Sequence, residues 1–251
     1  MPPSATADAL LRTVPVLFFM GMQISSLSTG MTISKNKNVG SLSPFPFFSM
    51  FVNGFTWTVY GTMKADITIF LPNFTSVIVG FFCAYIFHKH SGQHGSLPTI
   101  GVTSVVTVPK WMYTVSAAII IIIAVLGYSG EAYTIGLIGD VMAVCLMGSP
   151  LATLQTVIAT KSTEALPFYF SLMTFGNALS WSLFGIIIAK DPLVYVPNLL
   201  GFVLTVIQLS LFCCYGFGDR SAQKKDVGAA KYIQLSEGAA INKDQLPSYS
   251  K

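Results

Sequence analysis

The sequence predicts an all-α membrane protein of seven transmembrane helices, arranged as two parallel three-helix repeats joined by a linker helix (3-1-3). Three observations support this fold class. Apolar residues make up 53% of the 251 residues and charged residues only 10%, against about 25% charged in soluble domains. The chain contains seven apolar runs, most of which reach the roughly 20 residues needed to cross a bilayer. A polar motif also occurs twice inside these runs, about half the chain apart.

The apolar runs follow one another with short loops between most of them. They fall at 14–33, 45–63, 67–87, 111–127, 133–158, 166–189 and 192–217. The fourth is apolar on all sides around Ile119 to Ile123, as expected for a lipid-facing connector. The chain then divides into an N-terminal segment at 1–13, a first repeat at 14–87, a linker region at 88–132, a second repeat at 133–217 and a polar tail at 218–251 that we expect to be disordered.

Charge predicts the orientation of the spans. Eleven of the fourteen Lys and Arg residues lie in the tail or in the loops that follow the first, third and fifth spans. The positive-inside rule therefore places the N-terminus outside and the tail in the cytosol. With a single linker span between them, both repeats begin on the same side and are parallel copies. We expect the plasma membrane as the location, with an intracellular membrane as the alternative.

The duplicated motif combines Asn, Trp and Gly, four residues apart, with a later Pro-Asn pair. Its two copies are Asn53, Trp57, Gly61 and Pro72-Asn73, and Asn177, Trp181, Gly185 and Pro197-Asn198. Residues four apart share one face of a helix. The Trp and the final Asn of each copy lie at similar depth, roughly 9 Å inside the outer boundary. Four carboxamides and two indoles are therefore expected to form a ring at one level.

The chemistry of this ring favours a neutral, polyhydroxylated solute. A carboxamide offers two donors and an acceptor, a Trp face suits the apolar face of a pyranose ring, and none of the six side chains is charged. The alternative is that these residues act as contacts between helices and as interfacial anchors. Their duplication at equal depth favours a site.

Proline positions mark a second level. Pro46 and Pro167 begin the second and sixth spans, where a proline is also common as an ordinary first-turn residue. Pro150 lies inside the fifth span, so a kink or hinge is expected there. Asp140, an acid within the same span, raises proton coupling as a hypothesis, with a buried hydrogen-bonded carboxylate as the alternative.

Other function classes receive little support. No His/acid or Cys/His pair lies within the spans, so the sequence does not predict an enzyme, and no cofactor or metal is expected. The basic residues lie in loops and the tail, which argues against nucleic acid. The expected partners are a polar solute and the lipid bilayer, and homo-oligomer formation stays open. Three hypotheses for the function therefore stay open: a passive transporter, a proton-coupled carrier that uses Asp140, and a seven-span receptor. The internal repeat argues against the receptor.

Several of these motifs together resemble the SWEET family of sugar facilitators over about residues 10–217. They are the block from Gly148-Ser-Pro150 to Pro167-Phe168, the run Trp57-Thr-Val-Tyr-Gly61, Pro72-Asn73, and Pro197-Asn198-Leu-Leu-Gly201. The resemblance implies a 3-1-3 bundle, for which parallel repeats are a known family feature, and movement of mono- or disaccharides down their gradient by alternating access.

The resemblance also implies roles for individual residues. Its substrate-binding positions match Trp57, Asn73, Trp181 and Asn198; its pocket-size positions fall on Asn53 and Asn177; its pocket-wall positions fall on Met22 and Leu146; and its gating prolines match Pro46, Pro150 and Pro167, with Ser26 at the fourth. In that family, Asn at the size positions goes with monosaccharides. We therefore expect a bidirectional hexose uniporter, for glucose rather than sucrose. Because Ser26 retains its backbone N–H, the first span should be straighter than the fifth.

Overall fold

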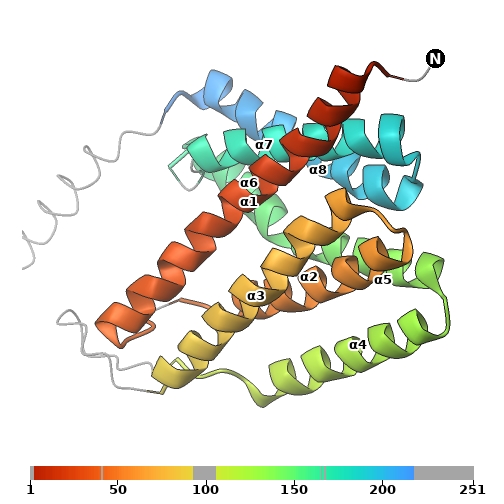
Figure 1. The fold of residues 1–251 in the computed structure, drawn as a ribbon. Helices are drawn as coiled ribbons and strands as arrows, with labels where there is room; N and C mark the ends of the chain where they lie inside the picture. Colours follow the sequence, from red (N-terminus) through yellow and green to blue (C-terminus); the bar gives the residue numbers. More distant parts are fainter. Residues whose placement is uncertain (1–2, 41, 93–105, 165, 167, 218–251) are drawn as a thin grey trace, which may run out of the picture.

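The computed structural model describes residues 3–40, 42–92, 106–164, 166 and 168–217, and within these residues it contains helices and connecting loops without strands. The helices are α1 (Ala5–Asn36), α2 (Phe45–Met63), α3 (Ile67–His90), α4 (Lys110–Tyr128), α5 (Ala132–Leu146), α6 (Gly148–Thr160), α7 (Phe168–Leu183), the π-helix η1 (Phe184–Ala189) and α8 (Pro192–Tyr215). Because α6 continues α5 and η1 continues α7, the helices form seven spans (Figure 1).

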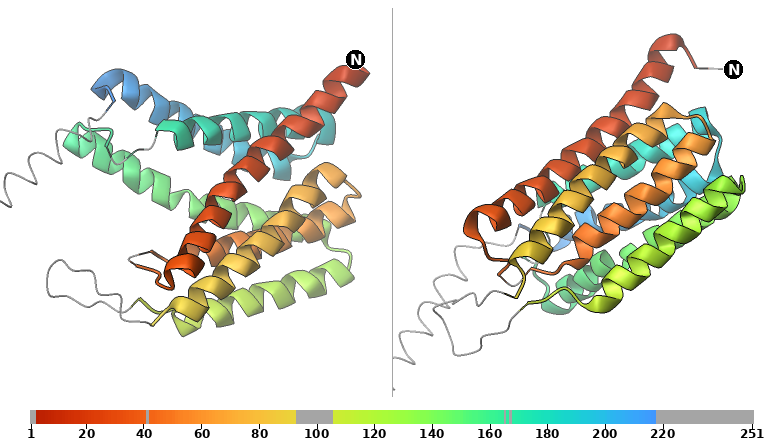
Figure 2. Two further views of the ribbon diagram at one scale, coloured as in Figure 1. Left: turned by 60° about the vertical axis from the view of Figure 1, so that its left-hand side comes forward. Right: turned by 60° about the horizontal axis from the view of Figure 1, so that its bottom comes forward.

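The helices form two groups of three spans, with α4 between them in sequence. In the first group α3 packs against α1 and α2, and in the second α8 packs against α7. The groups meet through two equivalent contacts, α2 with α5 and α1 with α7, while α4 lies against α2 and α5. Both groups begin at the same end of the molecule (Figures 1 and 2). The predicted 3-1-3 arrangement of parallel repeats is therefore confirmed.

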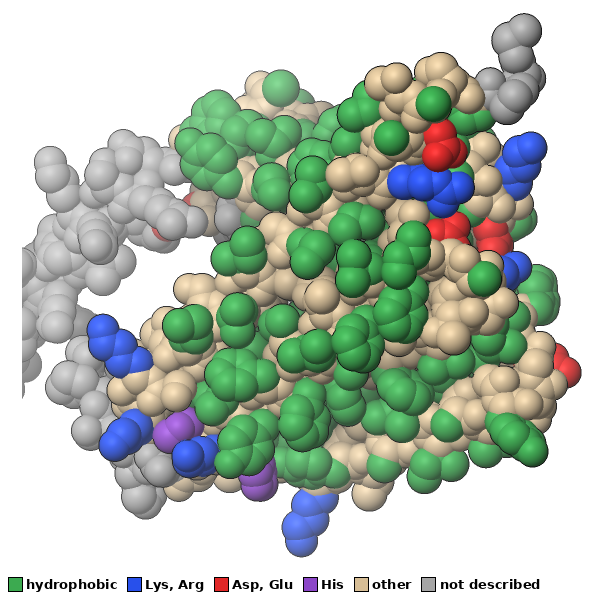
Figure 3. All heavy atoms as spheres, viewed as in Figure 1, with side chains coloured by type: hydrophobic (Ala, Val, Ile, Leu, Met, Phe, Trp, Pro, Cys, Tyr) green, Lys and Arg blue, Asp and Glu red, His purple; other side chains and the backbone are tan. Residues whose placement is uncertain are grey.

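The surface and the hydropathy of the helices identify a multi-pass membrane protein. Of the described spans, six are long and apolar enough to cross a bilayer. Hydrophobic side chains cover the middle of the face in Figure 3, whereas charged side chains gather towards its two ends. The remaining span, α2, is not among these six. This is consistent with its position, in which it packs against α3, α4 and α5.

The first helix is longer than its apolar run predicted. α1 begins at Ala5 rather than near residue 14. The Ser4 side chain caps this extension by accepting a hydrogen bond from the Ala7 N–H (3.3 Å), and Arg12 pairs with Asp8 one turn earlier (3.1 Å). Capping and i,i+4 pairing stabilise a helix without apolar residues, so hydrophobicity alone does not predict these first two turns.

The fifth span is interrupted and the first is not. The helix breaks at Met147, between α5 and α6, three residues before Pro150. A proline ring clashes with the carbonyl one turn earlier, which explains a break at this point. α1 runs unbroken through Ser26, as expected from its retained N–H. Pro46 lies in the first turn of α2, while Pro167 and the tail at 218–251 fall outside the described residues.

The π-helix η1 explains why the two motif copies differ in spacing. From Trp to the last Asn there are 16 residues in the first copy and 17 in the second. The Asp66 N–H donates to the Gly61 carbonyl, and the Asp191 N–H donates to the Gly185 carbonyl, both at 3.0 Å. The turn before α8 therefore contains one more residue than the turn before α3, although the same kind of hydrogen bond closes both. A wider π turn absorbs such an insertion, so both Asp residues still cap the next helix.

Candidate functional site

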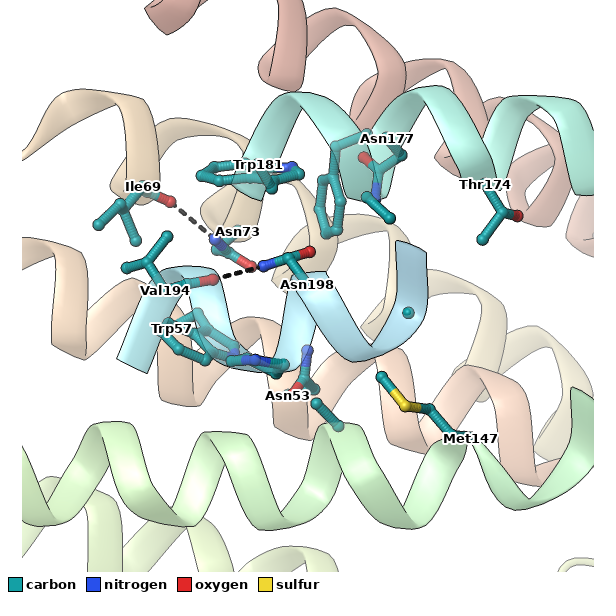
Figure 4. Close-up of a pocket in the computed structure, with 15 residues that line it drawn as sticks. Asn53, Trp57, Ile69, Asn73, Met147, Thr174, Asn177, Trp181, Val194 and Asn198 are labelled. Atoms are coloured by element: carbon teal, nitrogen blue, oxygen red, sulfur yellow. Dashed lines mark hydrogen bonds between the residues drawn. The ribbon is translucent and has the colours of Figure 1, made fainter. Parts of the chain in front are cut away.

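A cavity of about 240 Å³ lies where the two repeats meet. All six residues of the predicted ring line it: Asn53, Trp57, Asn73, Asn177, Trp181 and Asn198. Figure 4 shows Asn73 and Asn198 close together, with Trp181 on one side of them and Trp57 on the other. None of the residues that line the cavity carries a charge. The structure thus brings the two motif copies together around one neutral space.

Two of the asparagines are held in the same way by their own helices. Asn73 Nδ2 donates to the Ile69 carbonyl (2.8 Å), and Asn198 Nδ2 donates to the Val194 carbonyl (2.7 Å). Each bond uses one of two amide hydrogens and fixes the orientation of the carboxamide. The other amide hydrogen and the Oδ1 atom of each side chain stay available to a ligand.

Three other polar atoms at the cavity are buried without a hydrogen-bond partner in the protein. They are Asn53 Oδ1, Asn177 Oδ1 and Trp181 Nε1. Such atoms are rare, since leaving a buried donor or acceptor unpaired costs free energy. Two acceptors and one donor, contributed by both repeats, therefore need a partner that the described conformation does not supply.

Residues that the resemblance did not name also line the cavity. Met22 and Leu146 are not among the residues that line the cavity, and Leu146 instead lines a separate apolar hollow beside α4. Phe19 and Met147 line the cavity in their place. The difference between Leu146 and Met147 is one residue, which rotates a helical side chain by about 100°. The role of Met22 and Leu146 in the pocket wall stays a prediction.

Packing contacts between the repeats hold both indoles in place. The Trp181 ring packs edge-on against Phe19 of α1 (6.3 Å between centroids). Trp57 packs against Gly139 of α5 so closely that a Cβ on Gly139 would lie 2.9 Å from the indole. Each tryptophan is therefore positioned by a helix of the other repeat.

One end of the cavity is closed by polar contacts that join the repeats. The Tyr60 hydroxyl donates a hydrogen bond to Asp191, and Lys64 forms an ion pair with the same carboxylate (3.3 Å). Arg12 lies over the Phe184 ring, 5.9 Å from its centroid. Tyr60 and Phe184 are fully buried. These contacts close the end at which α3 and α8 begin, which we call the Asp191 end.

Sequence comparison places this architecture in a known group. The family described as sugar efflux transporters for intercellular exchange matches residues 9–94 and again residues 133–218. The two matches cover most of the chain and coincide with the two repeats. The chain belongs to the SWEET family.

Individual SWEET proteins are similar over nearly their whole length. The chain is 29% identical to sugar transporter SWEET1 of Mus musculus, over 86% of this chain and 94% of the relative. It is 28% identical to bidirectional sugar transporter SWEET2 of Arabidopsis thaliana, over 86% and 91%. A solved structure of a eukaryotic SWEET transporter has the same fold, with a TM-score of 0.66 and 20% identity over 84% of this chain and 97% of that one.

Within this SWEET chain, sequence reasoning did not find the contacts at the Asp191 end. Asp66 and Asp191 occupy matched positions just before the third helix of each repeat, and this match was the only sequence pattern that pointed to these contacts. It did not reveal that Asp191 pairs with Tyr60 and Lys64, because these residues are far apart in sequence. Asp140, which was singled out, does not line the cavity, but its Oδ1 atom is buried without a partner.

Proposed function

We propose that the protein is a bidirectional facilitative transporter, a uniporter, of monosaccharides such as glucose. The observation that carries this proposal is the uncharged cavity lined by matched Asn and Trp residues from both repeats. An uncharged ring has no obvious place for a co-transported ion. Family membership supports the same conclusion, since the relatives named above are sugar transporters.

The size of the cavity favours one sugar ring. Its volume of about 240 Å³ is below the roughly 300–1,000 Å³ of pockets that hold drug-sized ligands. Asn53 and Asn177 project into it from opposite repeats (Figure 4). A carboxamide is bulkier than a hydroxymethyl group, so two of them restrict the space for a second ring. Trp57 and Trp181 then offer apolar faces to the ring that does fit.

Alternating access follows from the closed Asp191 end. We infer from the positive-inside rule that this end faces the outside of the membrane, and on that orientation the described conformation is closed to the outside. The break at Met147 lies at the end of α5 that is farther from the Asp191 end. After the break, α6 packs against α5 and α8 of its own repeat. We propose that the sugar leaves on the cytosolic side in this state, and that the plasma membrane is the site of action.

Counterflow in proteoliposomes tests the proposal. Purified protein should exchange labelled glucose for unlabelled glucose without a pH gradient, and sucrose much less. Asn73→Ala and Asn198→Ala should each weaken glucose affinity by a few-fold to about tenfold, the value of one hydrogen bond of about 0.5–1.5 kcal/mol. Asn36→Ala, at the exposed end of α1, is the matched control. Normal exchange by both cavity variants would place the site elsewhere.

A proton-coupled carrier is the second candidate, and one observation favours it. The buried, unpartnered Oδ1 atom of Asp140 belongs to an acid within a span, and such acids often mark proton pathways. This alternative predicts accumulation of sugar against its gradient when a pH gradient is imposed, and loss of that accumulation in Asp140→Asn. Exchange that is unaffected by the gradient would exclude it.

A further inference from the structure

A buried amide on α1 lies next to the cavity without lining it. Gln23 is 7% exposed, whereas its neighbour Ile24 is 67% exposed. A carboxamide in the middle of a membrane span is costly to bury unless it is hydrogen-bonded. The contacts of Gln23 therefore indicate what it stabilises.

Gln23 bonds to the backbone beside a cavity residue. Its Nε2 atom donates to the Pro72 carbonyl (3.0 Å). The Thr75 hydroxyl donates its one hydrogen to the same Pro72 carbonyl (2.7 Å) and lies 3.2 Å from Gln23 Oε1, with which it can share that hydrogen. Gln23 and Thr75 thus hold one peptide group, and that group links Pro72 to Asn73. Because the peptide is planar, fixing its carbonyl also fixes the backbone from which the Asn73 side chain projects.

The second repeat lacks this arrangement. Met147 stands three residues before Pro150, just as Gln23 stands three before Ser26, and Leu200 occupies the position that corresponds to Thr75. Met147 lines the cavity itself and cannot donate a hydrogen bond to the Pro197 carbonyl. Asn198 therefore depends on its own helix, whereas Asn73 is also held by α1.

We propose that Gln23 is a positioning residue for sugar binding, which acts by fixing the Pro72–Asn73 peptide so that the Asn73 carboxamide is held ready for the ligand. This inference rests on the proposed function and deepens it. The first repeat supplies a pre-oriented amide, and the second supplies an amide whose backbone has no such tie to another helix. Pre-orientation improves affinity because less freedom is lost on binding.

The test is a double-mutant cycle on the full-length chain in nanodiscs. Glucose binding is followed by quenching of tryptophan fluorescence, since two of the three tryptophans line the cavity. Gln23→Met, which copies the second repeat, should raise the glucose Kd about threefold to tenfold, with Vmax in proteoliposomes little changed. The same substitution should have no further effect in an Asn73→Ala background but its full effect in an Asn198→Ala background.

Two further results decide the matter. Thr75→Val keeps the side-chain shape and removes the hydroxyl, so it should reproduce a smaller part of the rise in Kd even if Gln23→Met folds poorly. The inference would be overturned if Gln23→Met had equal effects in the Asn73→Ala and Asn198→Ala backgrounds. It would also be overturned if the glucose Kd were unchanged in both Gln23→Met and Thr75→Val. A wild-type protein that binds neither glucose nor fructose would instead overturn the proposed function itself.

Discussion

Replacing Tyr60 with Phe should open the Asp191 end more often. The Tyr60 hydroxyl donates to the Asp191 carboxylate across the repeats, and Tyr60 is fully buried. A hydrogen bond to a charged group contributes about 1.5–3 kcal/mol. If this bond exists only in the closed state, its loss shifts the closed-to-open ratio about tenfold to a hundredfold.

The neighbouring ion pair should matter less. The Lys64 side chain is 43% exposed, and its ammonium lies 3.3 Å from Asp191. Exposed ion pairs typically contribute about 0–1 kcal/mol, so Lys64→Met should change the ratio by about fivefold at most. The buried hydroxyl, and not the positive charge, is then the main contact that keeps this end closed.

Labelling in intact cells measures this ratio. Thr174 lines the cavity, so a Thr174→Cys variant reports on access to it. The exposed Cys145, Cys213 and Cys214 are first replaced by Ser, whereas the buried Cys83 is kept. A membrane-impermeant maleimide added outside should then react much faster when Tyr60 is replaced by Phe.

The order of the variants is the critical result. The labelling rate should rise from the parent to Lys64→Met and further to Tyr60→Phe. Labelling that does not change in Tyr60→Phe, or a larger increase in Lys64→Met than in Tyr60→Phe, would refute the assignment of the buried bond as the main closure.

Three further predictions concern the cavity and the neighbouring acid. Trp57→Ala and Trp181→Ala should each weaken glucose binding by a few-fold to about tenfold, as expected from the loss of about 0.5–1.5 kcal/mol of aromatic contact. Equilibrium binding that matches the wild type would argue against stacking of the sugar on either indole. The double variant Asn53→Ser with Asn177→Ser should admit sucrose and bind glucose less tightly; uptake assays that find wild-type selectivity would contradict the role of these amides in size exclusion. Asp140→Asn should leave glucose counterflow largely intact, so loss of exchange in a well-folded variant would show that the carboxylate takes part in transport.

Much of the site could be predicted because it lies within regular helices. The i,i+4 spacing of Asn53 and Trp57 places both on one face whatever surrounds them, and the second copy repeats the pattern at Asn177 and Trp181. Depth in the membrane follows from the helical rise. The structure accordingly places all of these residues around one cavity.

Which residues of α1 and of the fifth span face the cavity depends on how each helix is rotated about its axis. A resemblance implied Met22 and Leu146, which stay a prediction, and packing against neighbouring helices sets the rotation of each helix. Met147 lies about 100° around the helix from Leu146 and lines the cavity. The corresponding shift in α1 buries Gln23 against Pro72 and brings Phe19, one turn earlier, to the cavity.

By itself, the sequence determined the membrane-spanning class, the number of spans, the duplication and the ring of amides and indoles, because these depend on apolar length and on spacing along one helix. Only the tertiary structure decided which residues meet across the repeats. Tyr60 and Asp191 are 131 residues apart, and Gln23 and Pro72 are 49 apart. No local pattern specifies such pairs, since they form only when separate helices pack at a particular angle and depth.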